Sequence, residues 1–154
     1  MLDLYEEFKS IVETLNERGI DYAVCGGLAM AVHGLVRATI DIDLLIQSAD
    51  LDQVKAVARE LGFTIEANPM TFGKGAVEIR RVSKLDRDSG DVLILDLLLV
   101  TAKTEQAWDS RTKAEWEGTR LSIVSREGLI ALKSLRGSAI DLEDIAKLRA
   151  DDES

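Results

Sequence analysis

The sequence has little proline, cysteine or aromatic side chain. It contains one proline, so a Pro-rich linker is excluded, and only 5% of its residues are aromatic. Its single cysteine, Cys25, cannot form a disulfide within the chain. Because secreted domains of this size often depend on disulfides, the lone thiol favours a cytoplasmic location.

Long apolar runs are also absent. The longest one, at residues 92–100, is interrupted by Asp96 and is far shorter than the roughly 20 residues that span a bilayer. Residues 1–10 are acidic and amphipathic, unlike the basic and then apolar regions of a signal peptide. These features predict a protein without membrane association.

Basic residues are in deficit. Against 28 acidic residues stand 19 lysines and arginines, which gives a net charge of −9. Such a chain has no overall field that attracts nucleic acid, so a polynucleotide partner is disfavoured. At 46% apolar residues the chain of 154 can build a core. We expect a single domain over 1–154, with a core at about 20–100 and a helical segment at about 125–150.

Apolar periodicity and turn residues predict the order of elements. Helices are expected at 3–18, 28–33, 51–61, 125–135 and 141–150, and strands at 21–25, 40–46, 62–67, 76–84, 91–100 and 119–124. Strands alternate with helices early in the chain and follow one another in the middle. This order predicts an α/β or α+β fold, with a mixed sheet flanked by helices.

Asp41 and Asp43 are the first candidate site residues. Residues two apart on a strand point to the same face, so their carboxylates should lie side by side. Like charges in that arrangement repel, and a bound cation would turn the repulsion into attraction. An ordinary pair of surface strand residues is the alternative interpretation.

Asp96 interrupts a run that is typical of a buried central strand. A carboxylate in such a place is costly unless it is paired or binds a metal. If this strand is a neighbour of the strand with Asp41, the three carboxylates converge. Oxygen ligands of this kind suit Mg²⁺ or Mn²⁺ better than zinc.

Gly26 and Gly27 stand where a strand gives way to a helix. Glycine permits a tight turn and close approach of another group to the backbone, and the following amides favour an anion. The turn and the carboxylates together predict a site for a metal-bound phosphate. Taken alone, the two glycines would more simply be an ordinary turn.

The same residues carry a resemblance to a known family. The stretch Gly26-Gly27-Leu28-Ala29, then His33-Gly34, then residues 37–44 (RATIDIDL), resembles the signature of the nucleotidyltransferase superfamily, the DNA polymerase β-like fold. Within it, the likeness is to small AbiEii/AbiGii toxin-type or minimal nucleotidyltransferases. The resemblance implies that Gly26 and Gly27 bind nucleotide phosphates. It also implies that Asp41, Asp43 and Asp96 are catalytic and bind two metal ions.

The resemblance extends to residues 129–148, where a lysine precedes an arginine and two aspartates. These are Lys133, Arg136, Asp141 and Asp144. It implies that Lys133 faces the triphosphate, although a solvated helix lysine is the simpler alternative. Asp141 and Asp144 more simply favour a helix N-terminus through its dipole.

Two departures from the family pattern stand out. The chain is shorter than the toxin-type members, which carry a large added domain, and Leu28 offers no hydroxyl beside the glycine turn. Residues 62–90 match no part of the family.

Four other kinds of residue have simpler interpretations. Arg37 and Thr39 precede the Asp41 strand and would either contact the nucleotide phosphates or shape the loop. His33 is expected to end a helix. Cys25 is expected in the core, and the tryptophans at 108 and 116 are expected to pack rather than stack on a base.

The resemblance implies an enzyme that moves a nucleoside monophosphate from an NTP to an acceptor hydroxyl. Asp41 and Asp43 would hold both metals, and Asp96 would hold one and help deprotonate the acceptor, which could be RNA, a protein or a small molecule. The alternative is an inactive member of the fold that binds a nucleotide or a protein partner, as in a toxin–antitoxin pair. A single-strand RNA-binding module is a third class, against which the charge and the few aromatics both count.

Overall fold

One mixed β-sheet runs through the computed structural model, which describes residues 2–35 and 41–153. Its strands are β1 (Ala23–Cys25), β2 (Asp41–Ile46), β3 (Ile65–Glu66), β4 (Met70–Phe72), β5 (Val77–Leu85), β6 (Val92–Leu99), β7 (Thr112–Trp116) and β8 (Thr119–Ile123). The spatial order is β3-β5-β6-β2-β1-β8-β7, with β4 paired to β5. The pairs β2–β6 and β1–β8 are parallel and the others are antiparallel.

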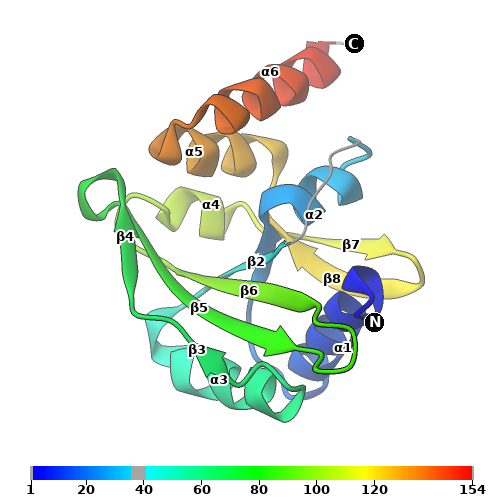
Figure 1. Cartoon of the computed structure of the whole chain (residues 1–154). Helices are drawn as coiled ribbons and strands as arrows, with labels where there is room; N and C mark the ends of the chain where they lie inside the picture. Colours follow the sequence, from blue (N-terminus) through cyan, green and yellow to red (C-terminus); the bar gives the residue numbers. More distant parts are fainter. Residues whose placement is uncertain (1, 36–40, 154) are drawn as a thin grey trace.

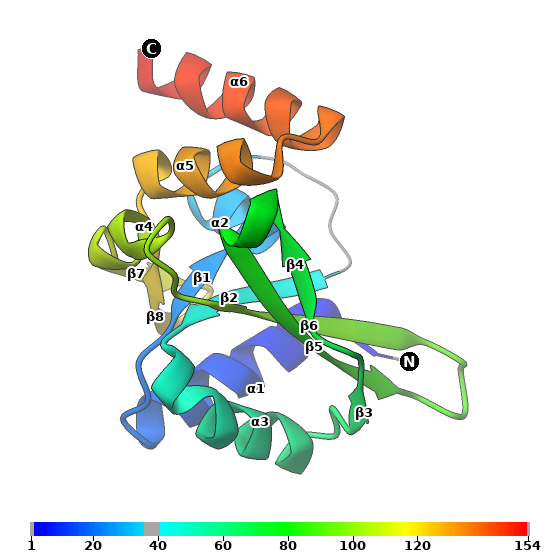
Figure 2. The ribbon, with the colours of Figure 1, turned by 90° about the vertical axis from the view of Figure 1, so that its left-hand side faces the viewer.

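Helices cover both faces of the sheet. They are α1 (Leu4–Glu17), α2 (Gly26–Val32), α3 (Leu51–Glu60), α4 (Glu105–Asp109), α5 (Arg126–Arg136) and α6 (Ala139–Glu153), with 3₁₀ turns at η1 (Ser48–Asp50) and η2 (Gly73–Gly75). In Figures 1 and 2, α1 and α3 lie below the sheet, while α2, α4, α5 and α6 lie above it. The predicted α/β class, a mixed sheet flanked by helices, is confirmed.

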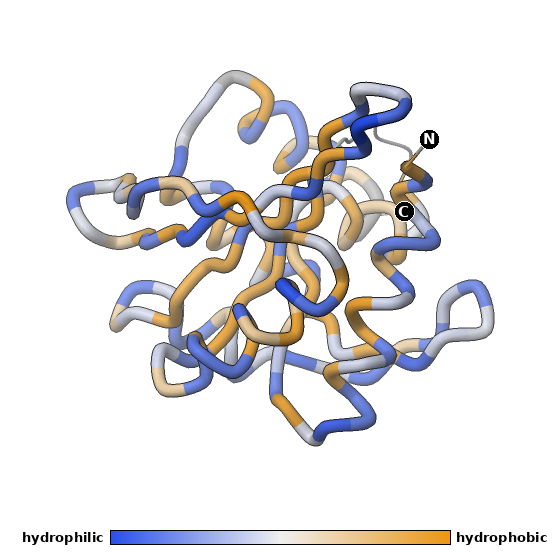
Figure 3. The backbone as a smooth tube through the Cα atoms, turned by 60° about the horizontal axis from the view of Figure 1, so that its bottom comes forward, coloured by the Kyte–Doolittle hydropathy of each residue, from blue (hydrophilic) through white to orange (hydrophobic). Residues whose placement is uncertain are grey.

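The face below the sheet is built on apolar side chains at helical spacing. Phe8, Ile11, Val12 and Leu15 of α1 are all buried. The Asp3 carboxylate begins this helix by accepting hydrogen bonds from the amides of residues 5 and 6. Figure 3 shows hydrophobic backbone gathered in the centre and hydrophilic backbone at the periphery. Among the described residues, no helix is both long and apolar enough to cross a membrane.

Three elements escaped prediction. The strands β4 and β7 lie at the margins of the sheet and leave most of their side chains exposed or half-buried, so they lack the apolar alternation of an inner strand. Helix α4 is a single short turn. Several boundaries were wrong as well. The helix α2 begins at residue 26 rather than 28, and α6 spans 139–153 rather than 141–150. The strand β1 begins at residue 23 rather than 21, and β3 spans 65–66 rather than 62–67.

Candidate active site

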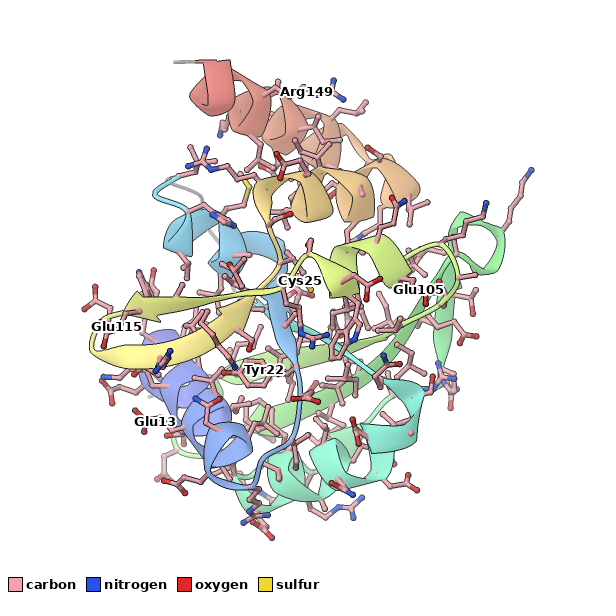
Figure 4. All side chains as sticks on the ribbon, turned by 180° about the vertical axis from the view of Figure 1, so that it is seen from behind. Glu13, Tyr22, Cys25, Glu105, Glu115 and Arg149 are labelled. Atoms are coloured by element: carbon pink, nitrogen blue, oxygen red, sulfur yellow. The ribbon has the colours of Figure 1, made fainter. Side chains whose placement is uncertain are left out.

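The turn from β1 into α2 brings the backbone against a carboxylate. Gly26 adopts φ +67°, and a Cβ atom there would lie 2.7 Å from the Cγ of Asp43. Only glycine leaves room for that carboxylate and accepts this backbone conformation without strain. Figure 4 labels Cys25, the last residue of β1, at this junction. The glycine turn and the Asp-x-Asp strand therefore meet directly.

The three predicted carboxylates lie on two adjacent strands. β2 and β6 are parallel neighbours, and the register places Asp43 beside Asp96. Asp41 precedes Asp43 by two residues and shares its face of the sheet. The predicted neighbourhood of the two strands is confirmed.

A cavity of about 150 Å³ opens over this face. It is lined by Gly26, Gly27, Asp41, Asp43, Arg81, Asp96, Lys133, Arg136, Ser138, Ile140 and Asp141. The structure thus gathers both glycines, the three aspartates and the lysine predicted from the sequence. Arg37 and Thr39, the other two predicted nucleotide-binding residues, lie outside the described residues.

Burial and neighbouring charge act together on Asp43. Burial, together with the nearby charges of Asp96 and Asp41, raises the pKa of its carboxyl to about 7. The carboxylates therefore repel one another in the protein alone. A cation between them would relieve this repulsion.

The donors fit a hard divalent cation, but they are not yet arranged as a metal centre. Within the described parts of the chain, no group of three or more His, Cys, Asp or Glu side chains is placed to hold a metal ion. Asp41 and Asp43 supply carboxylate oxygens of the kind that Mg²⁺ and Mn²⁺ bind, together with water and substrate phosphate. These two residues would hold the ion, with Asp96 next to them.

Asp96 already has a cationic partner that sequence reasoning missed. Arg81 of β5 donates from Nε to Oδ1 at 2.8 Å and from Nη2 to Oδ2 at 3.0 Å. Arg81 lies in the segment 62–90, in which the sequence analysis found no part of the family signature. The sequence did offer one indication of this pairing, because Arg81 is a charged residue on the same face of the strand as the buried Val77 and Ile79.

Lys133 is buried rather than solvated. It is 5% exposed and donates to the Asp144 Oδ2 at 2.9 Å. Asp144 is 2% exposed and lies beyond the first turn of α6, so the role predicted for it at a helix N-terminus was wrong. Asp141 does lie in the first turn of α6, where it accepts from the Ser138 amide and hydroxyl.

Cys25, His33 and the two tryptophans lie as predicted. Cys25 is buried, and burial raises the pKa of its thiol well above the usual value. His33 ends α2, with its Nε2 3.0 Å from the Val124 carbonyl oxygen. Trp108 is buried, and Trp116 packs against the rings of Tyr5 and Phe8.

Several solved structures share this fold. The protein superposes with a TM-score of 0.66 on ANT(2'')-Ia in complex with adenylyl-2''-tobramycin, at 16% identity over 96% of this chain and 87% of that one. The lincomycin-bound lincosamide adenylyltransferase LnuA gives a TM-score of 0.63, at 18% identity over 94% and 95%. A nucleotidyltransferase candidate from Thermotoga maritima gives 0.66, at 11% identity over 96% and 92%. At these identities the likeness shows the fold.

Sequence comparison carries the assignment further. No curated protein sequence matches. The family profile of the aminoglycoside-2''-adenylyltransferases, however, matches residues 7–148, nearly the whole chain. This confirms the resemblance seen in the residues around Gly26 and Asp41. The chain belongs to the aminoglycoside-2''-adenylyltransferase family and is a nucleotidyltransferase.

Proposed function

We propose that this enzyme moves AMP from ATP to a hydroxyl group of a small cationic acceptor of the aminoglycoside kind, with Mg²⁺ or Mn²⁺ as cofactor. The observation that carries the proposal is the meeting of the Gly26 turn with Asp41, Asp43 and Asp96 over one cavity. In the reaction, the acceptor oxygen attacks the α-phosphorus and the bond from that phosphorus to the bridging oxygen breaks. Pyrophosphate leaves, and the hydroxyl proton passes to a base.

Each side chain has a role that follows from its position. Asp41 and Asp43 hold the divalent cation, which when bound neutralises phosphate charge. Gly26 and Gly27 let the phosphates approach the backbone. Asp96 lies beside Asp43 and is placed to accept the proton of the acceptor once its partner Arg81 has moved.

Lys133 and Arg136, both on α5, would contact the triphosphate of a bound nucleotide in different ways. Lys133 is tied to Asp144 and lies deep in the wall of the cavity. Arg136 has a side chain that is 43% exposed and lies 3.8 Å from Asp141. We assign direct phosphate contact to Arg136 and a supporting contact to Lys133. Arg37 and Thr39 remain predicted phosphate ligands.

Charge supports a cationic acceptor. Four carboxylates line the cavity, Asp41, Asp43, Asp96 and Asp141, against the three cations Arg81, Lys133 and Arg136, and the chain carries a net charge of −9. An excess of negative charge attracts ligands of the opposite sign. Aminoglycosides, as polyamines with many hydroxyl groups, fit this field. The family match does not favour the alternative of an inactive toxin–antitoxin component.

The test is transfer of label from α-³²P-ATP to tobramycin or lincomycin, with Mg²⁺ or with EDTA. We expect transfer to tobramycin that exceeds transfer to lincomycin and stops in EDTA. The double variant Asp41→Asn/Asp43→Asn should lose at least about 100-fold in rate, because it removes charge stabilisation at the phosphates. It should also lose Mg²⁺-dependent ATP binding in calorimetry.

Asp52→Asn is the matched control, since it removes one carboxylate from α3 below the sheet. Its rate should equal that of the parent protein. Transfer that persists in EDTA, or in the double variant, would refute the metal site. Transfer to neither antibiotic, with ATP binding intact, would refute the acceptor class alone.

A further inference from the structure

Arg81 donates hydrogen bonds to both oxygens of the Asp96 carboxylate. Its Nε and Nη2 donate to Oδ1 and Oδ2 of Asp96, at 2.8 and 3.0 Å. This is the two-pronged geometry in which a guanidinium binds a carboxylate most strongly. The Asp96 side chain is only 6% exposed, so the pair is shielded from water on the carboxylate side. A cation that approaches Asp96 meets oxygens already engaged and a positive charge beside them.

The sheet holds the pair in place. β5 and β6 are antiparallel along their whole length, and their register sets Arg81 opposite Asp96. Residues directly opposite on neighbouring strands present their side chains to the same face. The Arg81 side chain is 35% exposed, and Arg81 lines the same cavity as Asp41 and Asp43. It reaches Asp96 from the side of β5, whereas Asp43 flanks Asp96 from the side of β2.

The carboxylates are therefore unequal toward a cation. Asp41 and Asp43 belong to β2, one strand further from Arg81 than Asp96 is. On Asp96 the guanidinium stands where a second cation would bind. When that contact is released, the guanidinium is left at the cavity wall, where it can meet an anion such as a nucleotide phosphate.

We infer that Arg81 is a positioning residue that occupies Asp96 in the metal-free protein and keeps divalent cations from it until a phosphate draws the guanidinium away. The inference rests on the proposed metal-dependent function and assigns an order within it. The first cation binds at Asp41 and Asp43. Asp96 joins the metal centre, and becomes available to the acceptor hydroxyl, only after nucleotide has entered.

The test measures binding of Mn²⁺ alone, by calorimetry and by loss of the free-ion spin-resonance signal, with no nucleotide present. Arg81→Gln removes the positive charge and the paired hydrogen bonds to Asp96 (the fork). We expect it to bind Mn²⁺ about tenfold more tightly than the parent, or to gain a second site, which is the size of effect that neighbours of metal ligands commonly have. Saturating Mn²⁺ should also raise its melting temperature more than that of the parent.

Two further variants separate positioning from mere stability. Arg81→Lys keeps the charge and loses the fork, so its Mn²⁺ affinity should fall between the parent and Arg81→Gln. Arg80→Gln is the matched control, because residue 80 has the opposite strand parity and donates to the Ile79 carbonyl. Its Mn²⁺ affinity should be that of the parent. In Arg81→Gln/Asp96→Asn the gain should disappear.

Equal Mn²⁺ affinity and stoichiometry in the parent and Arg81→Gln would overturn the inference. If Arg81→Gln does not fold without metal, Arg81→Lys decides, and affinity equal to that of the parent counts against the inference. A parent protein that binds no Mn²⁺, with ATP or without it, would instead refute the proposed metal dependence. Addition of ATP should narrow the gap between parent and Arg81→Gln, since phosphate then releases Asp96 in both.

Discussion

The two faces of β2 and β6 show how one pair of strands does two jobs. Toward α1 and α3 these strands present Ile42, Leu44 and Ile46, together with Leu95, Leu97 and Leu99, all of them buried. Toward α5 and α6 the same strands present Asp41, Asp43 and Asp96 around a cavity. The side-chain period of a strand makes this division possible, because each step of one residue changes the face.

The face toward α1 and α3 (the lower face) supplies the stability on which the face toward α5 and α6 (the upper face) depends. Burial of the Asp43 carboxylate and its repulsion by Asp96 and Asp41 oppose folding, and both raise the pKa of Asp43. Burial of apolar side chains below the sheet offsets that cost, at roughly 25 cal/mol for each Å² removed from water. The upper face is then held by paired charges: Arg81 with Asp96, and Lys133 with Asp144.

The strongest test of this division removes a buried cation from the upper face. Lys133→Met leaves Asp144 and Asp141, 2% and 5% exposed, without that cation. We expect the free energy of unfolding to fall by about 3–5 kcal/mol, the usual result of breaking a buried ion pair from one side. Urea denaturation measures it.

Lys147→Met, at an exposed position on the neighbouring helix α6, is the control and should change little. Adding Asp144→Leu to Lys133→Met should restore part of the loss, because the carboxylate that Lys133 contacts is then removed as well. A loss below about 1 kcal/mol in Lys133→Met would place the pair among ordinary surface contacts.

The lower face should respond in stability alone. Leu15→Ala empties a fully buried position on α1, and we expect it to cost about 2–5 kcal/mol of unfolding free energy. AMP transfer per folded molecule should stay at the parent rate. Residues of α5 and α6 line the cavity, and α1 lies on the opposite side of the sheet from these helices (Figure 2). A lower rate at full folding would show that the two faces are coupled.

What sequence could foresee on these faces was local. Parity alone placed Asp41 and Asp43 together, and the apolar run around Asp96 identified an inner strand. Arg81 escaped because its partner lies 15 residues away on another strand, and only the register of β5 on β6 joins them. The burial of Lys133 was not predicted, because it depends on the packing of α6 over α5, and no pattern within α5 indicates that packing.

Gly26 tests how closely the upper face is fitted. In Gly26→Ala the new methyl would occupy the place of the Asp43 carboxylate, so that side chain must move. A displacement of about 1 Å at a catalytic group can cost on the order of 100-fold, and we expect a loss of that size in kcat/KM for AMP transfer.

Gly19→Ala supplies the matched control. Gly19 has φ +65°, nearly that of Gly26, but a Cβ there would meet nothing within 4 Å. Both variants share the strain of a left-handed backbone, and only Gly26→Ala disturbs a carboxylate. Equal activity in the two variants would show that the contact with Asp43 has no role in the reaction.

The smallest effect, and the most direct on charge, is the pH dependence of Asp43. Its carboxyl has a pKa of about 7 in the folded protein, above the ordinary value of 3.8. Between those values the folded state holds a proton that the unfolded state has lost. The linkage relation then gives a contribution to stability that is complete below about pH 3.8 and is lost as the pH rises through about 7.

Asp43→Asn isolates this contribution, because its amide imitates the protonated acid and does not titrate. In EDTA, the melting temperature of Asp43→Asn minus that of the parent should be larger at pH 8 than at pH 5, because the parent loses stability progressively between about pH 3.8 and 7. With Mg²⁺ at pH 8 the parent should recover, since a cation takes over the place of the proton, whereas the variant should respond less. A difference that is the same at both pH values would mean that the repulsion on the upper face is already neutralised in the metal-free protein. The lower face would then have no such cost to offset, and the division of labour between the two faces would fail.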